Sequence, residues 1–417
     1  MHIAIIGNSA AGLTAARTIR KIKPSAGITV ISDESGPAYA RCLIPEILAG
    51  VRDIPGIGYA TQQFYQDYDI NLRSGIKVSS INAVNHKLKL EGGQVIKYDR
   101  LLVATGASPV QPGWPGSDLP SVFTLRTASQ AVMIRKMAID CASAVVEGGG
   151  LVSLKAAYAL KKRGVKDVAV IVRSPHILMK QLDRDSAGLV ENDLTSVGIK
   201  FYYGTGLAAA IQGPRGELQS VELEDGRQLP AGLVVIGKGV QPNSELIRNA
   251  GGKINRGILV NEYLETSLPG IYAAGDCIEV TDSVTGAQVV SGLWTLAVEQ
   301  GRIAGCNLAG QARKYPPPLT RLNSAQFGSV PFVSVGDVQG GDELAVYQGA
   351  GVYRKLCFRD NRLTGFIMAG LVDRAGVYTS LVKQAKKLSA PLKDRLINGK
   401  VTGADILPIL TRQGGIQ

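Results

Sequence analysis

Two copies of a strand–glycine loop–helix–strand pattern constrain the fold of this chain more than any other feature of its sequence. In the first copy, an apolar strand at 3–6 runs into a glycine-rich loop, and a helix at 13–22 leads to a second strand at 28–31. Such a loop brings a helix N-terminus close to a pyrophosphate, and an acid after the second strand suits a ribose hydroxyl. The residues expected to bind this first dinucleotide are Gly7, Ser9, Ala10, Ala11, Gly12, Asp33 and Glu34.

The second copy has a strand at 144–146, three consecutive glycines, a helix at 151–163 and a strand at 168–172. Its third loop position is Ser153 rather than glycine. The acid expected at the end of the last strand is missing: Val172 stands there, with Arg173 next. An arginine here favours a dinucleotide with a 2′-phosphate, although a solvent-facing strand end is the simpler alternative. The residues expected to bind this second dinucleotide are Gly148, Gly149, Gly150, Leu151, Val152, Arg173 and Gly237.

Two such loops in one chain indicate two bound nucleotides. The economical assignment is FAD on the first loop and NAD(P)H on the second. The alternative is a duplicated α/β scaffold whose loops are vestigial. A chain of 417 residues is too long for one compact core, which agrees with several domains. Flavin accepts a hydride and releases electrons singly, so this pair of nucleotides predicts an oxidoreductase.

Net charge and cysteine content limit the candidate partners and the cellular compartment of the protein. The net charge of +12 fits a solvated basic surface, an acidic partner protein or a phosphate-rich cofactor. Nucleic acid is a weaker candidate because the basic clusters resemble exposed helix faces. Five widely spaced cysteines indicate a reducing compartment rather than a disulfide framework, and no pair of them has metal-ligand spacing. With no apolar run long enough for a membrane span and no sign of a signal peptide, we expect a cytoplasmic protein without a metal.

Four further motifs extend the pattern over nearly the whole chain. They are an apolar strand ending in Thr105–Gly106, the segment LVVIGKGVQPN at 233–243, a strand ending in Gly275–Asp276, and a helix at 296–310. In this order they resemble the FAD-dependent pyridine nucleotide–disulfide oxidoreductase superfamily, and within it the branch of NADH oxidases, rubredoxin reductases and the nitrite reductase flavin module. The resemblance implies an α/β fold with two Rossmann-like three-layer domains and a small C-terminal α+β domain.

The resemblance also implies domain limits and flavin contacts. The FAD domain would comprise 1–110 and 240–318, the NAD(P)H domain 111–239, and the C-terminal domain 319–417. Asp276 would hydrogen-bond the FAD ribityl chain, and Arg41 would hold the FAD phosphates. A helix starting near Ala297 would point its N-terminus at the flavin ring. The other FAD contacts implied by the family pattern are Cys42, Thr105, Gly106, Gly275 and Thr295.

Cys42 leaves the mechanism open. A dithiol pair of the C-x₄-C type is excluded because Ile47 stands at the second position. The segment CLIP at 42–45 resembles relatives in which one cysteine faces the flavin and cycles through a sulfenate or mixed disulfide. Other relatives have an apolar residue there and pass electrons from the flavin edge. Lys155 stands where relatives often have a glutamate, and it either pairs with Glu46 across the flavin site or faces solvent.

Together these observations predict an NAD(P)H:acceptor oxidoreductase in which FAD passes electrons to a rubredoxin-type or iron–sulfur protein. The chain would act as a monomer or homodimer, or as the flavin subunit of a larger complex. One alternative is a thiol-dependent NAD(P)H oxidase, peroxidase or coenzyme A disulfide reductase. Another is a flavin-bearing redox sensor or assembly subunit. The candidate catalytic residues are Cys42, Lys155 and Glu46.

Overall fold

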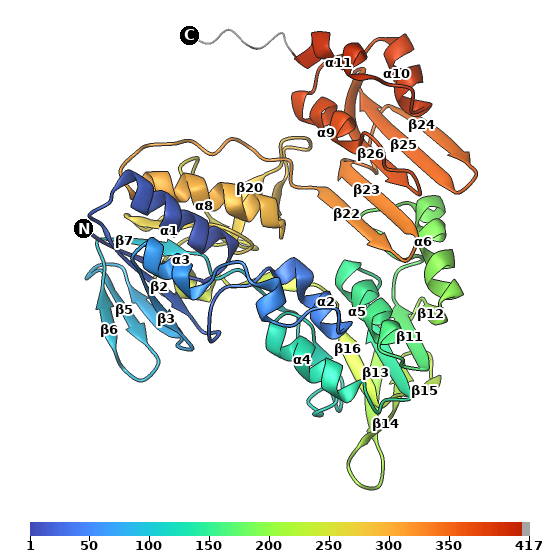
Figure 1. Ribbon diagram of the computed structural model, residues 1–417, viewed down its shortest axis with the longest axis horizontal. Coiled ribbons are helices and arrows are strands. Elements are labelled where there is room, and N and C mark those ends of the chain that lie inside the picture. Colours follow the sequence, from blue (N-terminus) through green and yellow to red (C-terminus); the bar gives the residue numbers. More distant parts are fainter. Residues whose placement is uncertain (411–417) are drawn as a thin grey trace.

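The computed structural model describes residues 1–410, in which two parallel five-stranded sheets follow one another along the chain (Figure 1). The first sheet has the strand order β19-β7-β1-β2-β3, so the N-terminal strand lies at its centre. The late strand β19 completes the sheet, which explains why this unit needs two separate pieces of sequence. Its strands are β1 (His2–Ile6), β2 (Gly27–Ser32), β3 (Ile70–Ser74), β7 (Arg100–Val103) and β19 (Ile271–Ala273).

The central strand β1 is a continuous apolar run because both faces of the sheet are covered. Its residues Ile3, Ala4 and Ile5 are fully buried, and β2 and β7 pair with it in parallel on either side. The helix that follows, α1 (Ala10–Ile22), begins at Ala10 rather than at the predicted position 13. The prediction was short because the last part of the glycine loop already forms the first turn of the helix.

Helix α1 packs against α8 (Trp294–Leu308) through small residues, and the two helices together cover one face of the first sheet. A Cβ on Gly301 would lie 2.3 Å from the carbonyl oxygen of Ala11. A Cβ on Gly305 would lie 2.8 Å from the Cβ of Thr18. The backbones therefore approach so closely that only glycine fits at these two places of α8, and the start of α1 packs against the middle of α8.

The second parallel sheet has the order β12-β11-β10-β16-β9. Along β10, Val146 faces the helices, while Val145 belongs to a separate core shared with an antiparallel three-stranded sheet. This second unit comprises β9 (Val122–Thr124), β10 (Ser143–Glu147), β11 (Asp167–Val172), β12 (Ile199–Tyr203) and β16 (Leu233–Ile236), with α4 (Ala128–Met137), α5 (Leu151–Lys162) and α6 (Arg184–Ser196), and the small sheet of β13 (Leu207–Gln212), β14 (Leu218–Leu223) and β15 (Gln228–Pro230).

The C-terminal unit is an antiparallel sheet in the order β22-β23-β26-β25-β24. One face packs on α6 through Phe332, Tyr353 and Ile367, and the other face carries helices (Figure 1). Asp360 and Asn361 both have positive φ, as a tight turn between two strands requires. The elements are β22 (Leu322–Phe327), β23 (Val330–Gly336), β24 (Glu343–Gly349), β25 (Val352–Arg359), β26 (Arg362–Ala369), α9 (Ala375–Gln384), α10 (Ala390–Ile397) and α11 (Gly403–Leu410).

Short elements connect the units. Helix α2 (Ile44–Leu48) comes from the first piece of sequence, yet Ile47 and Leu48 are buried in the core of the second unit against α4 and α5. The strands β8 (Ala107–Pro109) and β17 (Val240–Pro242) pair in antiparallel where the chain enters and leaves the second unit. The remaining α-helices and strands are α3 (Gln62–Asp67), β4 (Val78–Asn82), β5 (Lys87–Leu90), β6 (Val95–Lys97), α7 (Glu245–Asn249), β18 (Ile258–Leu259), β20 (Ile278–Thr281) and β21 (Gln288–Val290).

The expected α/β class, with two Rossmann-like sheets and a C-terminal α+β unit, is confirmed by this architecture. The numbered domain limits stay predictions. Among the described residues, none of the helices combines the length and the apolar character needed to cross a membrane.

The α1–α8 contact generates a test. Gly301→Ala should lower the free energy of unfolding by about 1–3 kcal/mol, because the added methyl forces the two helices apart. Gly188→Ala in α6 is the matched control: nothing lies within 4 Å of its Cβ position. The control should gain up to about 1 kcal/mol from helix propensity. Urea unfolding of the two variants measures both effects, and equal stabilities would contradict the steric argument.

Candidate flavin and nicotinamide sites

The first glycine loop joins β1 to α1 without space for side chains. Gly7 has a φ of +122°, and a Cβ on it would lie 2.1 Å from the carbonyl oxygen of Ala104. A Cβ on Gly12 would lie 1.9 Å from the carbonyl oxygen of Gly7. Ser9 does not cap α1 with its side chain, and the first turn carries no acid. The N–H groups at this helix start can therefore bind an anion such as a pyrophosphate.

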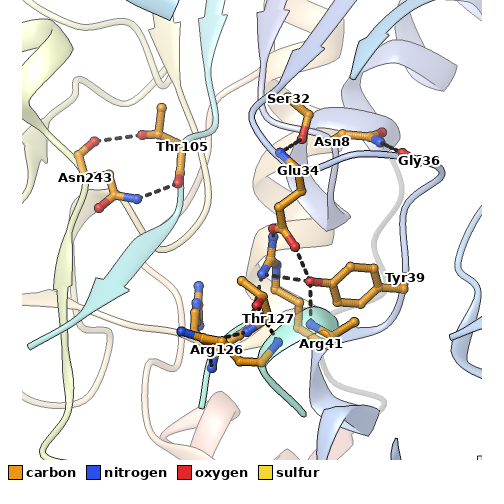
Figure 2. A network of polar contacts seen from close by, with 12 residues as sticks. Asn8, Ser32, Glu34, Gly36, Tyr39, Arg41, Thr105, Arg126, Thr127 and Asn243 are labelled. Carbon is orange, nitrogen blue, oxygen red and sulfur yellow. Dashed lines mark hydrogen bonds and ion pairs between the residues drawn. The ribbon is translucent and has the colours of Figure 1, made fainter. Parts of the chain in front are cut away.

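An acid and an arginine meet beside this loop (Figure 2). The Glu34 carboxylate forms an ion pair with Arg41 and accepts a hydrogen bond from the Tyr39 hydroxyl. Burial lowers the pKa of Arg41, but the Glu34 carboxylate and Tyr39 raise it above its ordinary value overall, so the guanidinium stays charged. Burial and the bond to Glu34 raise the pKa of Tyr39 to about 12, so its hydroxyl keeps its proton. The other expected acid, Asp33, is exposed and takes no part in this cluster.

A second arginine, which the sequence patterns did not single out, pairs with Asp276. The Arg126 Nη2 atom lies 3.1 Å from Asp276 Oδ2, and the Arg126 carbonyl oxygen accepts a hydrogen bond from Arg41 at 3.2 Å. Thr127 and Gln130 form a capping box at the start of α4, directly after Arg126. The T-x-x-Q spacing is a readable helix-start signal, but only the tertiary structure shows that the preceding arginine reaches Asp276.

The turns after β7 and β19 form the rest of this site. Thr105 Oγ1 donates to the Asn243 carbonyl oxygen at 2.7 Å, and Asn243 Nδ2 donates to the Thr105 carbonyl oxygen at 2.9 Å (Figure 2). Gly106 and Gly275 both have positive φ, and Gly275 N–H donates to the Gln300 side chain of α8 at 2.8 Å. Two more expected residues, Thr295 and Ala297, lie in the first turn of α8, which carries no acid. A Cβ on Gly275 would lie 4.0 Å from the Cβ of Ala297, so the turn after β19 lies beside the first turn of α8.

The second glycine loop is equally tight. Gly148 has a φ of +119°, and a Cβ on it would lie 2.6 Å from the carbonyl oxygen of Gly237. A Cβ on Gly149 would lie 2.7 Å from a methyl group of Val172. Ser153, which replaces the third glycine, is fully buried and donates its hydroxyl to the Gly237 carbonyl at 3.2 Å. The serine fits because its polar atom has a partner. Leu151 and Val152 follow in the first turn of α5.

Arg173 leaves the end of β11 and is mostly exposed, as the solvent-facing alternative requires, but it also has a partner. Its Nη2 atom lies 2.6 Å from Glu224 Oε1, on the turn that follows β14. Sequence spacing gave no signal for Glu224. A ligand phosphate at Arg173 must therefore compete with an acid that already neutralises the guanidinium.

Comparison with known proteins identifies the family. The family model described as pyridine nucleotide-disulphide oxidoreductase matches residues 1–301. The chain belongs to this family. A NADH oxidase of Methanocaldococcus jannaschii is 38% identical over 76% of this chain and 72% of its own. A rubredoxin-NAD(+) reductase of Pseudomonas putida is 30% identical over 76% of this chain and 82% of its own. A NAD-dependent persulfide reductase from A. fulgidus has a similar structure, with a TM-score of 0.88, 28% identity, and 97% and 80% of the two chains covered.

The chain spans about half the length of two further relatives from Bacillus subtilis, the assimilatory nitrate reductase electron transfer subunit and the nitrite reductase [NAD(P)H]. Family membership makes this protein an NAD(P)H-dependent flavoprotein oxidoreductase. The first glycine loop suits the adenine dinucleotide of FAD, because Gly7 and Gly12 keep side chains out of the tight turn between β1 and the start of α1. A small hollow next to it is lined by Asn8, Ser32, Glu34, Gly36, Tyr39 and Arg41.

The candidate catalytic residues of this flavoprotein are spread over α2, α5 and the turn before α2. Cys42 lies in a short 3₁₀ turn at Arg41–Leu43, is exposed and has a free thiol. Of the two alternatives for Lys155, the pair with Glu46 is not formed: Glu46 Oε2 instead lies 2.5 Å from Arg52 Nε. Arg52 lies six residues further along the chain and reaches Glu46 around the end of α2. Lys155 is half-buried on α5 and forms no ion pair in the described residues.

The Arg126–Asp276 pair generates a prediction. Arg126→Met should weaken FAD binding by about tenfold or more, because it removes a cation from the site and leaves Asp276 without its partner. Fluorescence titration of the apoprotein with FAD measures the dissociation constant. Lys136→Met, at an exposed position of the neighbouring helix α4, is the control and should bind FAD as the parent does. Equal FAD affinities in both variants would exclude Arg126 from the flavin site.

Proposed function

We propose that the flavoprotein binds FAD at the first glycine loop and NAD(P)H at the second, and passes electrons to a rubredoxin-type or iron–sulfur protein. Two tight glycine loops that exclude side chains carry this proposal, one on each parallel sheet. Bound flavin would supply the exchange between a two-electron donor and a one-electron acceptor. The chain's own residues would bind and orient the two nucleotides.

Contacts between the two units support a fixed position of the first glycine loop relative to the second. Tyr39 accepts a hydrogen bond from Ala128 N–H at 3.1 Å, and Arg41 donates to the Arg126 carbonyl. Helix α2 adds its apolar side chains to the core of the second unit. The segment that includes Arg41 and Cys42 is thereby held against the start of α4 and against α5, the helix that follows the second glycine loop.

The surroundings of Cys42 support exit of electrons from the flavin rather than through sulfur. A reactive thiolate needs a nearby cation, a helix N-terminus or a base. The adjacent cation, Arg41, is engaged by Glu34.

The net charge of +12 suits an acidic carrier protein. The relative named rubredoxin-NAD(+) reductase points to the same class of acceptor.

A thiol-dependent oxidase, peroxidase or disulfide reductase is the second candidate. The observation in its favour is that Cys42 is exposed and free, directly before the proline-containing start of α2. Electron acceptors separate the two functions. The proposed function needs an added carrier protein, whereas the second works with oxygen, peroxide or a low-molecular-weight disulfide.

Substitution of the thiol tests the choice. Cys42→Ser should retain flavin reduction by NAD(P)H and electron transfer to ferricyanide within about tenfold of the parent, if sulfur takes no part. Cys141→Ser, at a half-buried cysteine whose thiol contacts the Ser143 carbonyl, is the control. A loss of about 10³-fold in Cys42→Ser alone is the scale expected for an essential nucleophile. That outcome would establish the thiol mechanism.

Substitutions of Arg173 and Glu224 should change the preference for NADPH over NADH in opposite directions. Arg173→Ala should lower the NADPH/NADH ratio of kcat/KM by about fivefold or more, because a 2′-phosphate loses a bidentate cation. Glu224→Gln should raise the same ratio, because it frees Arg173 and removes a competing negative charge. Arg215→Ala, on an exposed turn of the β13–β14 hairpin, should leave the ratio unchanged. If neither Arg173→Ala nor Glu224→Gln changes the ratio, the pair belongs to the surface only.

A further inference from the structure

The apolar strand β10 ends in a buried carboxylate. Glu147 is 3% exposed, although the residues before it are an apolar run. Burying a carboxylate without partners is costly, so its contacts must explain its place. Its position is specific, because the next residue is Gly148, the first glycine of the nicotinamide loop.

Three donors from distant segments converge on Glu147. The ammonium of Lys238 lies 2.9 Å from Oε1, and the Leu207 N–H donates to the same oxygen at 3.2 Å. The Trp114 indole N–H donates to Oε2 at 3.4 Å. Trp114 lies where the chain enters the second unit, and Leu207 begins β13. The carboxylate is therefore neutralised by one cation and held in place by two further hydrogen bonds.

Glu147 and Lys238 lie at the ends of two neighbouring strands, β10 and β16, between which the strand order of the second sheet reverses. The chain leaves β10 through α5 to β11 on one side, whereas β16 lies on the other side of β10. Glu147 is paired with Ile236, and the Gly237 N–H donates to the Glu147 carbonyl at 2.8 Å. Lys238 follows Gly237 directly. In sheets of this type, dinucleotides bind outside the carboxyl ends of the strands at such a point.

The two side chains differ in their access to this edge of the sheet. The Lys238 side chain is 31% exposed, and that of Glu147 is 4% exposed. The ammonium has three donors and uses one on the buried carboxylate, so it can offer the others to a ligand. A pyrophosphate at the glycine loop carries negative charge, which an unpaired Glu147 would repel.

We propose that Lys238 binds the pyrophosphate of NAD(P)H and that Glu147 is the positioning residue that holds its ammonium at the edge of the glycine loop. This inference rests on the proposed nicotinamide site. It adds a cation that the glycine pattern does not contain. It also divides the work of the site: Arg173 acts at the adenosine end, and Lys238 acts at the pyrophosphate.

Binding to the intact flavoprotein tests the proposal without relying on turnover. Lys238→Met should weaken NADP⁺ and NAD⁺ binding by about tenfold or more, measured by calorimetry. The affinity for 2′-AMP, which has an adenosine end but no pyrophosphate, should change by less than about threefold. Lys238→Arg should restore dinucleotide binding because it keeps the cation. The control is Lys200→Met, in an ion pair with Asp167 at the opposite, amino end of the same sheet.

The double variant Glu147→Gln/Lys238→Met separates ligand binding by Lys238 from neutralisation of Glu147. Because it has no unpaired buried charge, it also provides the test if Lys238→Met alone is unstable. Continued weak dinucleotide binding supports the proposal, whereas recovery of parental affinity would show that Lys238 only neutralises Glu147 and would overturn it. Glu147→Gln alone should make the affinity more sensitive to salt, because Lys238 loses its counter-charge; an unchanged salt dependence would exclude the positioning role. If the parent binds neither NAD⁺ nor NADP⁺, the nicotinamide site itself fails.

Discussion

Steric exclusion of Cβ atoms at a few glycines is the constraint on which the rest of this structure depends. At Gly7, Gly12 and Gly301 an added methyl group would lie within 2.3 Å of a carbonyl oxygen. These contacts bring α1 close to β1 and α8 close to α1. The same exclusion recurs at Gly148 and Gly237 in the second unit. Each helix start is thereby brought to the carboxyl edge of its sheet with no side chain in between, and this is the geometry that a dinucleotide requires.

Charges at both candidate sites are paired, and two of the three pairs join segments that are far apart in sequence. Glu34 binds Arg41, Asp276 binds Arg126, and the buried Glu147 binds Lys238. A partly buried charge without a partner is unfavourable, so each pair favours one relative arrangement of its two segments. The Arg126–Asp276 pair joins the loop before α4 to the turn after β19. The first and second units therefore share polar contacts as well as the apolar contact through α2.

Sequence patterns predicted the features whose conformation depends on residues that are neighbours in sequence. The glycine loops and the buried strands beside them follow from local spacing, because backbone conformation there is decided within a few residues. Sequence patterns did not predict which charged side chains pair with one another. For Lys155, the sequence left open a pair with Glu46 or a solvent-facing position, and it did not indicate that Arg52 pairs with Glu46. Arg126 and Glu224 were not singled out, because nothing in their local sequence distinguishes them from ordinary surface residues.

The sequence alone determined the α/β class, the two dinucleotide loops and the family, since these depend on glycine spacing and on apolar periodicity along continuous segments. Only the tertiary structure decided which charged groups meet. It paired Arg173 with Glu224, and it brought Lys238, Leu207 and Trp114 to the carboxylate of Glu147. The physical reason is that side-chain pairing depends on distance in space, which the folding of separate segments onto common sheets creates and which spacing along the chain does not record.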